Sequence, residues 1–231
     1  MNNATEDIYR LALQLVHRHL EAAAVPHSID DGDLCFRGHR IGLSITFGNF
    51  AEQSGEFIAP VEFQMHVDGD DGSKFHVGTL GHGKTEELAV KSALEEWHLL
   101  TLAPVLAALG APAGSLKREG PTVRWQDWTV FAGRAGLRGT LPPGLASGGT
   151  FFRLLMNEIR SYIANWPTPA EFTLRSIFLM YSAAGETPEL QAAVDGYLDE
   201  ALTERLTKLE WPQSPEPYLY KQMFIFATGQ P

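Results

Sequence analysis

Two histidines, His66 and His76, are the residues of this 231-residue chain whose types and spacing could best support chemistry. Apolar and polar residues alternate from Phe57 to Asp68 and again on the return segment, which is the period of strands with one buried face. Pairing Val67 with Phe75 matches apolar side chains and places His66 opposite His76 on the polar face. Two imidazoles on neighbouring strands could supply half of a metal site or a proton relay.

A solvated pair on an exposed sheet face is the plainer interpretation of these histidines. The sequence fixes no third ligand nearby, so His66 and His76 are weak metal candidates and no cofactor is expected. In an alternative reading they join Glu62 in a small-molecule or metal-dependent enzyme, with its site in a cleft between two halves of the chain. The common motifs of hydrolases, zinc proteases and nucleotide-binding proteins do not occur, so no catalytic or cofactor-binding residue is predicted.

The hairpin that would position the two histidines has an acidic tip. The Val67–Phe75 pairing leaves a three-residue loop from Asp70 to Gly72, and Gly72 can adopt the left-handed conformation that such a loop requires. The tip does not have the oxygen ligands of a calcium-binding EF-hand loop, because Gly72 and Thr79 stand where further ligands are needed. Turn formation therefore explains the aspartates.

A long helix is predicted after the hairpin. Thr85 is suited to the N-cap position, and Glu86 and Glu87 place negative charge in the first turn of the helix. Pro104 predicts a kink or a restart of the helix, and Gly110 predicts its end.

The order of elements in the first half resembles the double-stranded RNA-binding domain. A helix near the N-terminus, several strands and the sequence Gly81-His82-Gly83-Lys84-Thr85 before the last helix carry this resemblance. In that family lysines normally follow the Thr and bind phosphate, whereas Glu86 and Glu87 stand here. The resemblance therefore implies local architecture, and no nucleic-acid binding is expected.

The composition supports the same exclusion. The chain has 28 acidic and 18 basic residues, a formal net charge of -10 and a hydrophobic content of 44%. These values are typical of a globular protein and disfavour nucleic acid or an anionic membrane as a partner. No apolar stretch is long enough to span a membrane and the N-terminus is not a signal peptide, so a cytoplasmic location is expected. The only cysteine, Cys35, is read as a small core residue.

The chain is predicted to be an α+β protein made of two halves, each a mainly antiparallel sheet covered by helices. Residues 1–110 form the first half, in the order helix, strands, hairpin and helix, with a polar loop from Gly48 to Glu56. Small residues and prolines make 111–121 the candidate linker. Residues 122–231 begin with a strand-rich segment and continue as an α-β-α-β half.

The helix predicted in this last part runs from Thr187 to Trp211, because Thr187-Pro188-Glu189 is a good helix start. Asp195, Asp199 and Glu204 would lie on it. They could form a carboxylate cluster, but without paired acids on another element the better interpretation is a solvated helix face.

The chain resembles an uncharacterised bacterial family, domain-of-unknown-function family 6348. The hairpin-helix block and the ending Trp211-Pro212, followed by a strand from Tyr220 to Phe226, carry this resemblance. It implies no assigned activity. The acidic charge and the absence of catalytic motifs make a non-enzymatic cytoplasmic protein-binding protein the leading hypothesis: an adaptor, chaperone-like or immunity protein whose partner is another protein, possibly basic.

Overall fold

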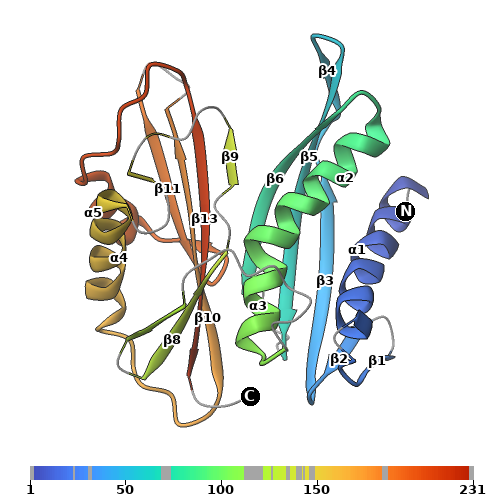
Figure 1. The fold of residues 1–231 in the computed structure, drawn as a ribbon, viewed down its shortest axis with the longest axis horizontal. Helices are drawn as coiled ribbons and strands as arrows, with labels where there is room; N and C mark the ends of the chain where they lie inside the picture. The colour runs from blue at the N-terminus through green and yellow to red at the C-terminus, as the bar shows by residue number, and fades with distance from the viewer. Residues whose placement is uncertain are drawn as a thin grey trace. The chain divides into compact units, whose positions relative to one another are not determined.

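The computed structural model describes residues 3–22, 24–30, 33–68, 74–111, 122–125, 127–133, 136–138, 142, 144–145, 149–183 and 187–228. These residues form two antiparallel sheets with their helices, which confirms the predicted α+β class (Figure 1). The chain divides into two compact units, Met1–Arg118 and Glu119–Gln230.

The N-terminal unit is built around one long strand, β5, which carries β6 on one edge and β3 followed by β4 on the other. Figure 1 shows α2 lying across β5 and β6, and α1 beside β3. The strands β1 and β4 are additional to those predicted from the sequence. The elements are α1 (Asn3–Ala22), β1 (His27–Asp30), β2 (Asp33–Phe36), β3 (His39–Phe47), β4 (Ala51–Gln53), β5 (Glu56–Val67), β6 (Phe75–Gly83), α2 (Glu86–Trp97), the π-helix η1 (His98–Leu102) and α3 (Ala103–Ala108).

The register of the β5–β6 hairpin differs by two residues from the predicted one. Met65 lies opposite Phe75, and Gln64 lies opposite His76. A shift of two residues keeps every side chain on its face, so apolar matching cannot separate the two registers. The predicted pairing of His66 with His76 is therefore wrong. The predicted loop from Asp70 to Gly72 lies outside the described residues.

Two glycines at the end of β6 let α2 pack closely on the sheet. A Cβ atom at Gly81 would lie 1.6 Å from the Ala89 carbonyl oxygen, and one at Gly83 would lie 2.5 Å from the Ala89 nitrogen. No side chain fits at these distances, so glycine is required at both positions. The close approach stacks the Trp97 ring on Phe63, with centroids 4.8 Å apart.

The predicted start and end of the helix after the hairpin are confirmed, and at Pro104, where a kink or a restart was predicted, the chain stays helical and passes through the π-helical turn η1. The Leu88 N–H donates to the Thr85 hydroxyl at the N-cap. Ahead of Pro104, which lacks an N–H, the Ala103 N–H donates to the His98 carbonyl five residues earlier, as in a π-helix. Gly110 then ends the helix with a φ of +74°.

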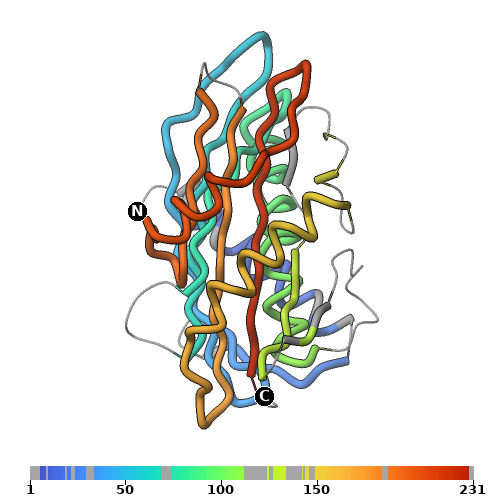
Figure 2. Tube along the Cα trace, turned by 90° about the vertical axis from the view of Figure 1, so that its left-hand side faces the viewer, coloured from blue at the N-terminus to red at the C-terminus, as the bar shows by residue number. Residues whose placement is uncertain are grey.

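The C-terminal unit has its own sheet, in the order β12-β11-β10-β13-β8-β7, with β9 beside β13. β10 and β13 pair along their whole length and run side by side in Figure 2. The elements are β7 (Thr122–Trp125), β8 (Trp128–Ala132), β9 (Gly136–Arg138), α4 (Thr150–Ile163), β10 (Thr173–Ser182), β11 (Glu189–Val194), β12 (Tyr197–Leu198), α5 (Glu200–Thr207) and β13 (Leu219–Thr228).

The helix predicted from Thr187 to Trp211 is wrong over its first half. Residues 189–198 form the hairpin β11–β12, and the helix α5 begins only after Asp199. The hairpin turns at Asp195-Gly196, where φ is +50° and +87°. These values are those of a two-residue type I′ turn, for which Asp-Gly is a preferred sequence. After β7–β9, the order is therefore α-β-β-β-α-β instead of α-β-α-β.

Helices α4 and α5 share one core with the sheet of the C-terminal unit. Phe152 of α4 lies 6.4 Å from Phe224 of β13, measured between ring centroids. Leu202 and Leu206 of α5 are buried in the same cluster, which also contains Trp211. This packing holds the end of α5 and the segment after it beside β11 and thereby forms the site described next.

Candidate functional site

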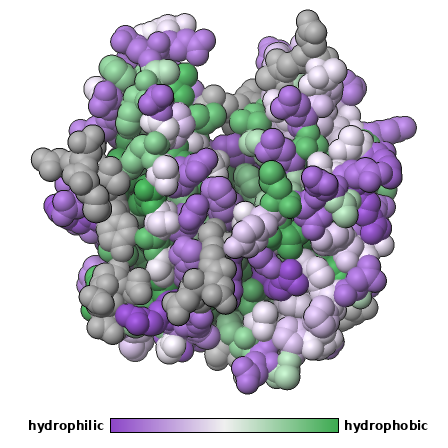
Figure 3. Space-filling model, turned by 180° about the vertical axis from the view of Figure 1, so that it is seen from behind, coloured by the Kyte–Doolittle hydropathy of each residue, from purple (hydrophilic) through white to green (hydrophobic). Residues whose placement is uncertain are grey.

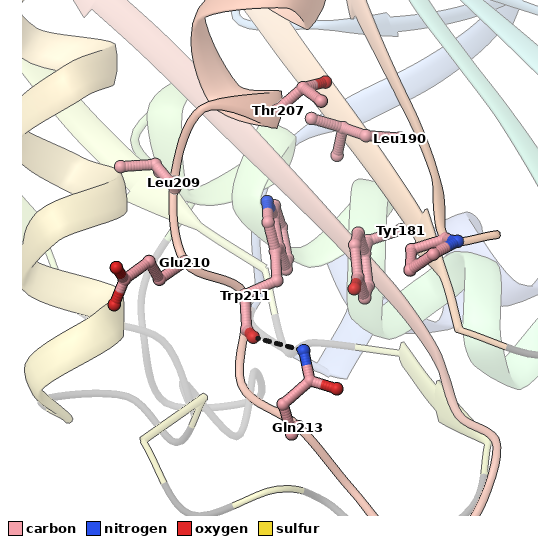
Figure 4. A pocket seen from close by; sticks show the side chains of 8 residues that line it. Tyr181, Leu190, Thr207, Leu209, Glu210, Trp211 and Gln213 are labelled. Atoms are coloured by element: carbon pink, nitrogen blue, oxygen red, sulfur yellow. Dashed lines mark hydrogen bonds between the residues drawn. The ribbon is translucent and has the colours of Figure 1, made fainter.

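A pocket of about 640 Å³ lies in the C-terminal unit, between β10–β11 and the segment that follows α5 (Figure 4). Its volume is within the range of small-ligand and side-chain binding sites. The strands contribute Tyr181 and Leu190, and the segment after α5 contributes Trp211. The complete lining is Tyr181, Pro188, Leu190, Thr207, Leu209, Glu210, Trp211 and Gln213.

Two stacked aromatic rings form the floor of the pocket. The rings of Tyr181 and Trp211 are nearly parallel, at 5°, with centroids 4.1 Å apart, and Figure 4 shows them side by side. The Trp211 indole N–H donates to the Leu206 carbonyl at the end of α5, at 3.0 Å. Phe151 of α4 packs on Trp211 at 4.8 Å between ring centroids. The floor is therefore fixed before any ligand arrives.

Two phenols, that of Tyr181 in the floor and that of Tyr218 next to it, have raised pKa values. The Tyr218 hydroxyl donates to the Pro212 carbonyl at 2.7 Å, and the hydroxyls of Tyr181 and Tyr218 share a second hydrogen bond. Burial is the main cause that raises the pKa of both phenols above the ordinary value. A phenol with a raised pKa releases its proton less readily, so this arrangement favours binding over proton transfer.

The rim of the pocket is polar. Thr207, Glu210 and Gln213 are exposed, and the Gln213 amide donates to the Trp211 carbonyl at 3.4 Å (Figure 4). Glu210 is the one carboxylate among the residues that line this pocket. An apolar slot with polar residues around it can hold an apolar group of a ligand or of another protein.

The histidines singled out in the sequence lie on the N-terminal sheet. His66 on β5 and His76 on β6 share the polar face but are not directly opposite each other. His76 Nε2 lies 3.7 Å from the Glu62 carboxylate, so these two of the three proposed enzyme residues form an ion pair when the histidine is protonated. Within the described ranges, no three His, Cys, Asp or Glu side chains come together in a group that could hold a metal ion.

Other histidines of the N-terminal unit also pair with single carboxylates. The pairs are His17 with Glu21, His39 with Asp68, and His82 with Glu56. Each pair lies on a different part of the unit, and neither of the two pockets described for this structure is lined by them. This distribution indicates local ion pairing in place of a shared active centre.

The carboxylates expected as a helical cluster have separate partners. Asp195 accepts from Arg175 Nε at 2.6 Å, Asp199 accepts from the Tyr162 hydroxyl, and Glu204 pairs with Lys208 at 2.9 Å. Asp195 is in the hairpin turn and Asp199 is the N-cap of α5, so the prediction of one helical face is wrong. Each carboxylate stabilises a local structure.

Sequence reasoning missed the pocket because it placed Leu190 on a helix. The pair Asp195-Gly196 between apolar segments was the signal for a hairpin. A strand there would have placed Leu190 beside the preceding strand. No local signal brings Trp211 onto Tyr181, because that contact depends on the packing of α5.

Comparison with known proteins gives a family and no activity. In the described part of the chain, no helix is both long enough and apolar enough to cross a membrane. No curated protein and no solved structure matches the chain. The model of a family of unknown function, DUF6348, matches residues 31–228, which are most of the chain. The chain therefore belongs to the DUF6348 family.

Proposed function

We propose that this protein binds another protein and that the aromatic pocket of the C-terminal unit holds part of that partner. The observation that carries the proposal is the stacked floor of Tyr181 and Trp211 in a pocket whose lining also includes Glu210. Rigid aromatic floors are typical of the anchor pockets of protein interfaces, because a buried side chain gains contact area there at little entropic cost.

The charge of the chain supports a basic partner. A formal net charge of -10 attracts basic proteins and speeds their encounter. In the space-filling view from behind, hydrophilic side chains are spread over the visible face among smaller apolar areas (Figure 3). Charge can therefore guide association, while the pocket supplies a specific point of attachment.

The two parts of the pocket should contribute unequally to affinity. Burying one leucine-sized side chain in the slot contributes about 1.5–3 kcal/mol. An exposed ion pair at Glu210 contributes about 0–1 kcal/mol, because water and salt screen it. We therefore expect substitutions in the slot to weaken or prevent stable binding and substitutions of Glu210 to change mainly the rate of association.

Site-specific photo-cross-linking in the native host tests the proposal. A photoreactive amino acid is placed at Gln213, which lines the pocket and is exposed, and in a matched control at Glu171, which is exposed elsewhere in the same unit. We expect a defined protein adduct from position 213 only, weakened by Glu210→Lys in the same chain. No adduct at 213, or equal adducts at both positions, would contradict the proposal.

A further inference from the structure

On the edge of β11 that faces away from β10, the backbone groups of one residue are hydrogen-bonded to neighbouring residues and those of another residue are not. The Ala192 N–H donates to the Thr203 hydroxyl at 3.0 Å, and the Ala192 carbonyl accepts from the Asp199 N–H at 2.9 Å. Both backbone groups of Ala192 therefore point away from β10. The start of α5 thus covers this part of the strand edge, which protects it from pairing with other chains.

Leu190 lies two residues before Ala192 on the same strand. Backbone direction repeats every two residues in a strand, so the N–H and C=O of Leu190 also point away from β10. The register agrees, because Leu179 opposite Ala192 and Tyr181 opposite Leu190 are alternate pairs of the same ladder. Among the described residues, none is hydrogen-bonded to these outward-facing groups of Leu190.

The open position coincides with the pocket. Leu190 and its cross-strand neighbour Tyr181 both line the pocket, and in Figure 4 the Leu190 side chain lies above the Tyr181 ring. The open edge is short, since Pro188 has no N–H and Ala192 is already paired. A residue placed opposite Leu190 would direct its side chain to the same face as Leu190 and Tyr181.

We propose that the partner contributes an extended segment that adds antiparallel to β11 at Leu190. One apolar residue of the segment exchanges two backbone hydrogen bonds with Leu190 and places its side chain against Tyr181 and Trp211. A lysine or arginine nearby in the segment faces Glu210, which fits the acidic charge of the chain. This inference rests on the proposed function and specifies how the pocket recognises its partner.

The test uses the full-length protein and a fluorescein-labelled synthetic peptide, Lys-Thr-Val-Leu-Val-Thr-Lys, with blocked ends. Fluorescence anisotropy measures the affinity of this peptide and of two versions with a single N-methylated amide, at the central Leu or at the following Val. Only alternate amides of an added strand face β11. We expect methylation at Leu to weaken binding about tenfold and methylation at Val to change it less than about twofold.

Two variants locate the binding. Thr207→Trp fills the pocket from an exposed position and should abolish peptide binding, whereas Thr168→Trp, at an exposed threonine outside the pocket, should not. Equal affinities of the two methylated peptides, with binding still sensitive to Thr207→Trp, would overturn strand addition and leave the pocket as a side-chain site. No binding of the unmodified peptide would overturn recognition of an extended basic and apolar segment, while the cross-link from Gln213 tests the proposed function separately.

Discussion

Asp68 in the N-terminal unit and Asp195 in the C-terminal unit form the same backbone lock. Each follows a valine and precedes a glycine in the sequence, and each has a positive φ, +51° and +50°. The N–H of each aspartate donates to a carbonyl on the neighbouring strand, that of Arg40 or Ser176, at 2.9 and 3.0 Å. One carboxylate oxygen accepts the N–H of that same residue, at 2.7 and 2.8 Å. The two units therefore secure the end of a strand in the same way.

The locks differ in the group that binds the second carboxylate oxygen. In the N-terminal unit it is His39, and in the C-terminal unit it is Arg175, whose guanidinium lies 4.0 Å above the Trp166 ring. The side chain of Asp68 is 42% exposed and that of Asp195 is 25% exposed. The C-terminal lock thus has a better-buried carboxylate and a counter-ion that is always charged, and it secures the strand that carries the candidate site. The same aspartate lock is therefore more strongly supported in the unit that contains the pocket.

The largest effect is expected from Asp195→Ala. The substitution leaves the Ser176 N–H and the Arg175 guanidinium without their carboxylate acceptor and places alanine at a positive φ, which together should cost about 2–4 kcal/mol of stability. Urea unfolding followed by tryptophan fluorescence measures this loss, because the C-terminal unit contains Trp211 and Trp166. A loss below about 1 kcal/mol would show that the lock is not an important support of the hairpin.

Asp68→Ala should cost less, about 1–2 kcal/mol, because its carboxylate is more exposed and water can replace part of the lost hydrogen bonding. Hydrogen exchange followed by mass spectrometry should show faster exchange where β3 meets the end of β5, with β10 and β11 unchanged as the internal control. A cost equal to or above that of Asp195→Ala would reverse the comparison.

The sequence predicted the parts of the fold that depend on local chemistry. The N-cap at Thr85 and the stop at Gly110 were predicted because single residues determine them, and Pro104 indicated the place where the helix becomes irregular. Strands β4 and β12 were not predicted because the two turns next to them were not recognised. Ser54-Gly55 and Asp195-Gly196 both have positive φ values typical of two-residue hairpin turns.

The candidate site was less predictable than the fold. Histidines drew attention because their chemistry is versatile, and all eight lie in the N-terminal unit. The pocket uses Tyr181 and Trp211, which read as ordinary core residues in a sequence. Only the packing of α5 beside β11 leaves a hollow between them, and such long-range packing has no local signal.

Arg175→Lys tests the comparison of the two locks with a smaller expected loss of stability. Lysine keeps the charge but loses the planar contact with Trp166 and the Nε donor to Asp195, which should cost about 1 kcal/mol. Arg205→Lys is the matched control, because Arg205 pairs with Glu158 at the surface, and its loss should stay below about 0.5 kcal/mol. Equal losses in the two variants, measured by urea unfolding, would mean that the stacking on Trp166 adds nothing.

The smallest expected difference between the two units is a difference in stability that is visible only in alkaline solution. Burial, followed by the hydrogen bond to Asp199, raises the pKa of Tyr162 from 10.0 to about 12, and burial also raises the pKa of Tyr181 and Tyr220. The unfolded chain then loses phenolic protons at a lower pH than the folded chain. The stabilisation is complete below pH 10 and is lost as the pH rises towards about 12.

This loss should begin in the C-terminal unit, because these tyrosines all lie there. Phenolate absorbance gives the ionisation, and hydrogen exchange after brief alkaline exposure shows which strands open. Asp199→Asn removes the charge beside Tyr162 and should bring the onset of ionisation of that phenol closer to pH 10. If β3 and β5 opened before β10 and β13, alkaline sensitivity would not follow the buried phenols, and some other group would have to set the difference between the two units.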